Sequence, residues 1–179
     1  MISRKLCLLG AFAVGKTSLL RRFVQGVFDE RYLTTLGVKI DTRVVELDTA
    51  AVKLVIWDIE GADPADGESQ LISSRMKTYL KGTDGVLLVA DGTRPATIET
   101  AHRIYEWLNG EYPGMAAALL LNKSDLTDQW QADSHHLEGF GELLQMFTTS
   151  ALSGENVERT FMYLAETLTK DDEPPDGDR

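Results

Sequence analysis

The sequence predicts an α/β fold with a mostly parallel six-stranded sheet, one antiparallel strand and helices on both faces. Short apolar runs alternate with longer segments of helical character, which is typical of parallel strands joined by helical crossovers. The runs 86–90 and 117–121 are apolar at successive positions, as expected where helices cover both faces of a sheet. Residues 38–47 alternate instead, and residues 48–50 can turn this segment back onto the next run as an antiparallel hairpin.

Each predicted element has a local basis in the sequence. The predicted strands are residues 5–9, 38–47, 52–57, 85–90, 116–121 and 143–148. The predicted helices are residues 16–25, 70–81, 95–109 and 157–170. In the last helix, Val157, Phe161, Leu164 and Leu168 recur at spacings of three and four, which gives one apolar stripe. We expect one domain over residues 1–170, followed by a disordered acidic, proline-containing tail at 171–179.

Composition narrows the class of protein. The chain has 179 residues, of which 43% are hydrophobic, so it can bury the core of one compact domain, and we expect a monomer. Its net charge of -10 argues against nucleic-acid binding, which needs an excess of Lys and Arg to displace counterions from phosphates. Cys7 is the only cysteine, which excludes an intramolecular disulfide and a zinc site built from several cysteines.

The sequence carries no membrane or export signal. No apolar stretch approaches the roughly 20 residues that span a bilayer, and the N-terminus lacks the pattern of a signal peptide. The chain begins Met-Ile and ends without a prenylation cysteine, so we expect no direct lipid anchor. Membrane attachment would come from a partner or from residues outside this chain. We therefore expect a cytoplasmic protein.

A phosphate-binding motif follows the first predicted strand. Residues 10–17, Gly-Ala-Phe-Ala-Val-Gly-Lys-Thr, match Gly-x-x-x-x-Gly-Lys-Ser/Thr at every required position. The glycines let the backbone wrap a polyphosphate with its N–H groups inward, and the following helix presents its positive N-terminal end to the same anion. Lys16 would reach the β- and γ-phosphates, and the Thr17 hydroxyl would bind Mg²⁺.

A second motif, Asn-Lys-Ser-Asp at 122–125, follows the apolar run 117–121, where a parallel strand opens into the ligand crevice. The Asp125 carboxylate can accept two hydrogen bonds from the N1–H and the exocyclic amine of guanine, which adenine does not offer. The wrong base would leave a buried carboxylate unpaired, at a cost of about 2 to 5 kcal/mol. ATPases, kinases and GTPases all use the phosphate motif, but the two motifs together predict guanine-nucleotide binding.

With these motifs the sequence resembles the Ras superfamily of small GTPases over residues 4–168, and most of all its Rab-type branch. The resemblance implies a P-loop NTPase fold of the G-domain type that binds GTP, GDP and Mg²⁺ and hydrolyses GTP. Residues 149–151, Thr-Ser-Ala, are similar to the element whose backbone N–H meets the guanine O6, and Phe28 falls where the family places a ring against the base. The implied nucleotide contacts are Gly10, Ala13, Val14, Gly15, Lys16, Thr17, Ser18, Phe28, Thr35, Gly61, Asn122, Lys123, Asp125, Ser150, Ala151 and Leu152.

Two further segments resemble the nucleotide-responsive switches of the family. Residues 31–38 resemble the first switch and make Thr35 the threonine that closes on Mg²⁺ when the γ-phosphate is present. Residues 57–61 resemble the Asp-x-x-Gly motif, in which Asp58 holds Mg²⁺ through water and the Gly61 N–H reads the γ-phosphate. The implied metal ligands are Thr17, Thr35 and Asp58, and the implied catalytic residues are Lys16, Thr35 and Gly61. Loss of the γ-phosphate would relax both segments. Effector proteins are expected to bind through residues 35–38 and the segment after Gly61, and exchange-factor and activating proteins are also expected at the switch regions.

Two positions depart from the family pattern. Ala62 stands where most members have a glutamine that orients the attacking water, so intrinsic hydrolysis is expected to be slow. Phe12 replaces a small residue that faces the γ-phosphate, and its ring can obstruct an arginine finger, which is worth about 10³ to 10⁵ in rate. Asp63, Asp66 and Glu68 are expected to form a solvated acidic second switch, although one of them can position water instead.

These departures leave three functions open. The leading hypothesis is a regulated switch that cycles between GDP and GTP. The second is a GTP-locked or pseudo-GTPase scaffold, in which the nucleotide is mainly structural. The third, a P-loop kinase for a small molecule, would need an acceptor pocket and a lid and would leave residues 122–125 unexplained. Arg21 and Arg22 are expected to belong to an exposed helix face.

Overall fold

The computed structural model describes residues 1–29, 34–62, 72–141 and 144–170. The strands in these ranges are β1 (Ile2–Gly10), β2 (Val38–Glu46), β3 (Ala51–Ile59), β4 (Gly85–Asp91), β5 (Ala116–Asn122) and β6 (Gln145–Thr148). The α-helices are α1 (Lys16–Gln25), α2 (Ser74–Tyr79), α3 (Pro95–Glu111), α4 (Ser134–Leu137) and α5 (Val157–Lys170). Two short 3-10 helices, η3 (Thr127–Gln129) and η4 (Glu138–Phe140), flank α4.

All six strands belong to one sheet in the order β2-β3-β1-β4-β5-β6. Each neighbouring pair is parallel except β2 and β3, which form the antiparallel hairpin, with Val38 opposite Ile59 and Glu46 opposite Ala51. This topology confirms the predicted fold class. The parallel strands β1, β3, β4 and β5 all end at the same edge of the sheet, so the loops that follow them meet there.

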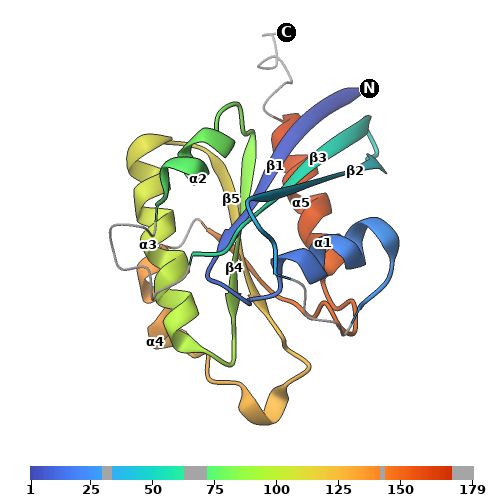
Figure 1. Cartoon of the computed structure of the whole chain (residues 1–179). Helices are drawn as coiled ribbons and strands as arrows, with labels where there is room; N and C mark the ends of the chain where they lie inside the picture. The colour runs from blue at the N-terminus through green and yellow to red at the C-terminus, as the bar shows by residue number, and fades with distance from the viewer. Residues whose placement is uncertain (30–33, 63–71, 142–143, 171–179) are drawn as a thin grey trace, which may run out of the picture.

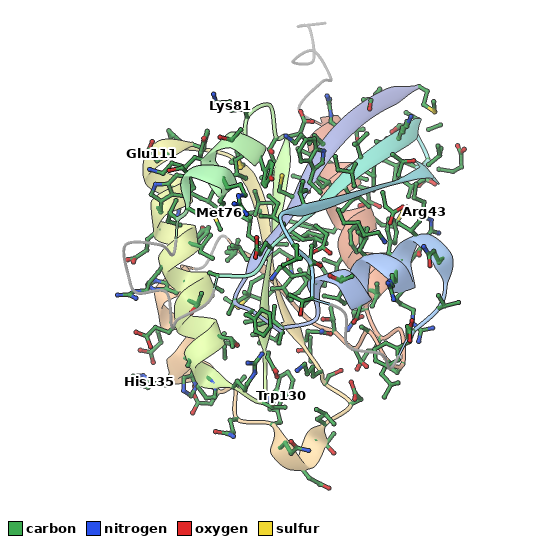
Figure 2. All side chains as sticks on the ribbon, viewed as in Figure 1. Arg43, Met76, Lys81, Glu111, Trp130 and His135 are labelled. Atoms are coloured by element: carbon green, nitrogen blue, oxygen red, sulfur yellow. The ribbon has the colours of Figure 1, made fainter. Side chains whose placement is uncertain are left out.

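Helices cover both faces of the sheet (Figure 1): α1 and α5 pack on one face, and α2 and α3 on the other. The Phe23 and Phe161 rings stack at 4.0 Å between centroids and join α1 to α5. On the opposite face, Met76 of α2 is buried against the sheet (Figure 2). No helix within the described ranges combines the length and the apolar character needed to cross a membrane.

The structure corrects the predicted extent of α2 and adds one helix that was not predicted. Helix α2 is shorter than the predicted 70–81: it begins after Ser73, whose hydroxyl caps it by accepting a hydrogen bond from the Met76 N–H. Residues 70 and 71, residue 143 of the sixth predicted strand, and the predicted tail 171–179 lie outside the described residues. Helix α4 was not predicted, because its four residues are too few to show a periodic pattern; the Asp133 side chain caps it.

Candidate functional site

A cavity of about 340 Å³ opens at the edge of the sheet where β1, β3 and β5 end. Its wall contains every predicted nucleotide contact except Gly10 and Ser150. Among the described residues it also contains five that were not predicted as contacts: Phe12, Arg21, Asp29, Thr34 and Leu126. A cavity at the carboxyl ends of parallel strands is the usual position of a ligand site in an α/β sheet.

The loop between β1 and α1 forms one end of the cavity. Its two glycines have the left-handed backbone that the loop requires, with φ of 150° at Gly10 and 101° at Gly15. A Cβ on Gly10 would lie 2.1 Å from the Val89 carbonyl oxygen, and a Cβ on Gly15 would lie 2.3 Å from the Asn122 Nδ2 atom. Gly10 therefore packs behind the cavity against β4, and Gly15 lets the loop reach the end of β5.

Lys16 is the first residue of α1 and lines the cavity, although only 6% of it is exposed. Its ammonium group donates to the carbonyl oxygens of Gly10 at 3.1 Å and Ala11 at 2.9 Å. Burial lowers the pKa of Lys16 to about 8, while the nearby Asp58 carboxylate opposes this shift. A buried cation at the start of a helix is well placed to bind an anionic group.

Three oxygen-bearing side chains meet next to Lys16. The Thr17 hydroxyl lies 2.7 Å from the Thr35 hydroxyl and donates to Asp58 Oδ2 at 2.5 Å. The Thr35 hydroxyl lies 3.2 Å from the same Asp58 oxygen. Burial raises the pKa of Asp58, opposed by hydrogen bonds from both threonines and by the Lys16 and Lys39 charges. Asp58 Oδ1 is buried and finds no hydrogen-bond partner among the described residues.

The opposite end of the cavity is built from the residues that follow β5 and β6. Asp125 lines the cavity, and its Oδ1 accepts a hydrogen bond from the Ser150 hydroxyl at 2.6 Å. Ser150 is fully buried, so it holds Asp125 from behind and does not itself line the cavity. Ala151, Leu152 and Phe28 form further parts of the wall.

Asn122 joins the two ends of the cavity. Its Nδ2 donates to the Val14 carbonyl at 3.0 Å, in the loop after β1. Its Oδ1 accepts from the Ala151 N–H at 3.2 Å and from the Thr149 hydroxyl at 3.3 Å, in the segment after β6. Because Asn122 is 2% exposed, its main contribution is to hold these two segments together.

Some side chains that shape the site were missed by the sequence analysis. Arg22 was expected to be exposed, but it is partly buried and binds the carbonyl oxygens of Ala151, Leu152 and Gly26. Arg21 lines the cavity and pairs with Asp29 at 3.2 Å. Helical periodicity shows which side of α1 is polar, but it does not show that a distant loop covers that side.

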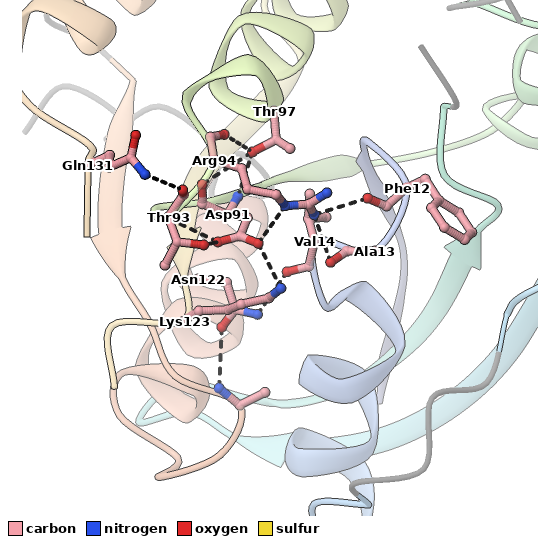
Figure 3. Close-up of polar contacts among 11 residues, drawn as sticks. Phe12, Ala13, Val14, Asp91, Thr93, Arg94, Thr97, Asn122, Lys123 and Gln131 are labelled. Atoms are coloured by element: carbon pink, nitrogen blue, oxygen red, sulfur yellow. Dashed lines mark hydrogen bonds and ion pairs between the residues drawn. The ribbon is translucent and has the colours of Figure 1, made fainter. Parts of the chain in front are cut away.

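Asp91 and Arg94 were also missed (Figure 3). Arg94 lies between the Asp91 carboxylate and the carbonyl groups of Phe12 and Ala13, while Lys123 approaches the same carboxylate. The available signal was the position of Asp91 directly after the apolar run 86–90, because the carboxyl end of a parallel strand points to the ligand crevice.

The segment after β3 contacts the loop after β1. The Ala62 N–H donates to the Gly10 carbonyl at 3.1 Å, and the Phe12 N–H donates to the Ala62 carbonyl at 2.9 Å. A carboxylate oxygen of Glu60 accepts from the Gly37 N–H at 3.0 Å and pairs with Arg75 at 3.3 Å. Glu60 does not line the cavity. Residues 31–33 and the acidic residues Asp63, Asp66 and Glu68 lie outside the described residues.

The fold and this cavity define a P-loop protein of the G-domain type. The Ras family matches residues 5–170, and the chain belongs to that family. It is 37% identical over 173 residues to the human protein called Ras-related protein Rab-25, across 93% of this chain and 75% of the relative. The bovine protein of the same name is 36% identical over the same shares of both chains. The chain is therefore a small GTPase of the Ras superfamily and is Rab-like.

Proposed function

We propose that this small GTPase is a GDP- and GTP-binding switch that requires Mg²⁺ and hydrolyses GTP slowly on its own. The observation that carries the proposal is the cavity of about 340 Å³, which has Lys16 and Thr17 at one end and Asp125 at the other. A cationic, N–H-rich end suits a di- or triphosphate, and an acidic end suits the hydrogen-bond donors of guanine. Phe28 gives the intervening wall an apolar ring for the base.

Recognition of guanine is assigned to Asp125. The Ser150 hydroxyl occupies Oδ1 at 2.6 Å and fixes the rotation of the carboxylate, so the side chain is oriented before the base arrives. A preoriented acceptor loses less conformational freedom on binding, which favours both affinity and discrimination. The Ala151 backbone N–H, which donates to Asn122 Oδ1 at 3.2 Å, is proposed to meet the guanine O6 as a shared donor that keeps this bond.

Mg²⁺ fits the cluster of Thr17, Thr35 and Asp58. All three side chains offer oxygen, the ligand type that Mg²⁺ prefers, and the buried Asp58 Oδ1 has no other partner among the described residues. The cation would neutralise charge on the β- and γ-phosphates. Asp58 is proposed to contribute through water and in the ionised form, which a nearby cation favours.

Slow hydrolysis is proposed because none of the described residues around Gly61 offers a group that positions water. Ala62 carries only a methyl group, and its backbone N–H and carbonyl are engaged with Gly10 and Phe12. The Glu60 carboxylate is held outside the cavity by the Gly37 N–H and Arg75. A methyl group cannot orient an attacking water. The rate of hydrolysis would then depend on how Lys16, Thr35 and Gly61 position the nucleotide and stabilise its charge.

Switching is assigned to the segments that contain Thr35 and Gly61. They are already connected, because the Glu60 N–H donates to the Gly37 carbonyl at 2.8 Å and the Glu60 carboxylate accepts from the Gly37 N–H. If one segment changes conformation when the γ-phosphate is lost, these hydrogen bonds would transmit the change to the other segment. Leu36 is 81% exposed and Ile40 is 47% exposed, so the first segment presents apolar contacts for effector, exchange-factor or activating proteins.

A GTP-locked scaffold is the second candidate, and Phe12 and Ala62 are the observations that favour it. The experiment that separates the two is single-turnover hydrolysis of bound GTP in the wild-type protein and in Ala62→Gln. The switch proposal predicts slow but complete conversion to GDP over hours. GTP that stays intact throughout would favour the scaffold, and rapid hydrolysis by the wild type would contradict the proposed role of Ala62.

The Ala62→Gln variant separates two causes of slow turnover. An increase of about tenfold or more would mean that the missing amide is the main limitation. If the rate does not change, the limitation lies instead in the contacts of Gly10 and Phe12 with the Ala62 backbone, since these survive the substitution. Ser74→Gln, at an exposed position that begins α2, is the matched control and should leave the rate unchanged.

A further inference from the structure

A buried carboxylate at the end of β4 collects two cationic side chains. The Asp91 side chain is 1% exposed and lies 2.8 Å from Arg94 Nε and 2.7 Å from Lys123 Nζ. Its other oxygen accepts from the Thr93 N–H at 2.9 Å and from the Thr93 hydroxyl at 2.6 Å. With four donors to one carboxylate, the position of the Arg94 guanidinium is strongly constrained.

From this position Arg94 reaches the loop after β1. Its terminal NH2 group donates to the Phe12 carbonyl at 3.2 Å and to the Ala13 carbonyl at 2.9 Å (Figure 3). The next carbonyl along the chain, that of Val14, accepts from Asn122 at 3.0 Å. Side chains therefore hold three consecutive peptide groups of the phosphate-binding loop by their oxygen atoms.

Fixing these carbonyls also fixes the direction of the N–H groups. In a trans peptide the C=O of one residue and the N–H of the next point in opposite directions. The carbonyls of Phe12, Ala13 and Val14 point toward Arg94 and Asn122, so the N–H groups of Ala13, Val14 and Gly15 point away from them. Those residues line the cavity, so this arrangement turns a row of donors toward the place where phosphates would bind.

The loop needs such support because part of its backbone is unfavourable. Ala13 has φ of 60°, a left-handed conformation that is unfavourable for a residue with a side chain. The group of Asp91, Arg94 and Lys123 also carries one negative and two positive charges, so it leaves an excess positive charge beside the anion site.

We propose that Arg94 is a positioning residue for the phosphate-binding loop and that Asp91 orients it. The inference rests on the proposed nucleotide binding and extends it to a residue outside both sequence motifs. Arg94 does not line the cavity, so it acts through the peptide groups of the loop and not by contact with the nucleotide. Asp91 also binds Lys123 of the base motif, which links the phosphate end of the site to the base end.

The experiment measures release and affinity of guanine nucleotides in Arg94→Ala with Mg²⁺ present. The substitution removes two charge-assisted hydrogen bonds that the partly exposed Arg94 donates to the loop carbonyls. We therefore expect the variant to release a fluorescent GDP analogue about tenfold faster than the wild type. The preference for GDP over GMP should fall by a similar factor, because the second phosphate depends on the loop. The preference for GDP over ADP should not change, because Asp125 is untouched. Arg159→Ala on α5 is the matched control and should behave as the wild type.

Arg94→Lys provides the second variant. It keeps the positive charge but cannot hold both carbonyls with a planar fork, so release should be about threefold faster than from the wild type. This variant carries the test if Arg94→Ala does not fold. Wild-type release rates in a folded Arg94→Ala would overturn the inference while leaving the proposed function standing. An equal loss of the preferences for GDP over GMP and for GDP over ADP would also overturn it, because that result would indicate a general structural role. A wild-type protein that binds neither GDP nor GTP would instead refute the proposed function itself.

Discussion

Replacement of Asn122 by alanine should loosen both ends of the cavity at once. The side chain is 2% exposed and makes one hydrogen bond to Val14 and two to the segment that contains Thr149 and Ala151. Each such bond contributes about 1 kcal/mol, and a buried group left unpaired costs about 1 to 3 kcal/mol. Allowing for partial relaxation, the loss is about 3 kcal/mol, which corresponds to about a hundredfold change in an equilibrium constant.

The assay is release of a fluorescent GDP analogue in the presence of Mg²⁺. Asn122→Ala should release the nucleotide about a hundredfold faster than the wild type, because both the phosphate loop and the base-facing segment lose their common anchor. Asn109→Ala, an exposed position on α3, is the matched control and should release it at the wild-type rate. A folded Asn122→Ala protein with a release rate within about threefold of wild type would refute the view that Asn122 couples the two ends.

Three further substitutions test the packing of Gly10, the charge of Asp91 and the role of Glu60. Gly10→Ala should lower the free energy of unfolding by about 3 kcal/mol or prevent folding, since its Cβ would lie 2.1 Å from the Val89 oxygen; unchanged stability in denaturant titrations would contradict this packing. Burial acts to raise the pKa of Asp91, but the hydrogen bonds that the carboxylate accepts outweigh it and hold the pKa below its usual range. The carboxylate therefore stabilises the fold above about pH 4, and this contribution disappears as the pH falls through the lower folded-state pKa. Asp91→Asn should make the unfolding free energy depend less on pH in the acid range, and a pH profile identical to that of the wild type would refute this role of Asp91. Glu60→Ala should leave single-turnover hydrolysis within about twofold of wild type, because the carboxylate is bound to the Gly37 N–H outside the cavity; a loss of about tenfold would show that Glu60 positions water.

The sequence was sufficient to predict the sheet and its connections. Runs such as 86–90 are apolar at every position because both faces of their strand are covered, and their short length favours strands over helices. Helix α1 begins and ends at the predicted residues, since Gly15 and Gly26 flank it with left-handed backbone that favours glycine. Helix α4 has four residues, so its only local signal was the capping residue Asp133.

The contacts that support the site were harder to predict. Motif residues such as Lys16 and Asp125 follow parallel strands that end at the same edge of the sheet, so the sheet topology explains why both line one cavity. Arg22 and Arg94 instead meet the carbonyl groups of Ala151 and Ala13, which are distant in sequence. A backbone carbonyl carries no residue-specific signal, so nothing in the sequence marks it as the partner of a given arginine.

Guanine recognition by Asp125 can be measured by calorimetry of nucleotide binding in the presence of Mg²⁺. The wild type should bind GDP far more tightly than ADP, and Asp125→Ala should lose about a hundredfold or more of this preference. Asp128→Ala, an exposed acidic residue three positions along the chain, should retain the full preference. Equal affinity of the wild type for GDP and ADP, or a preference that survives Asp125→Ala, would contradict the claim that this cavity recognises guanine through that carboxylate.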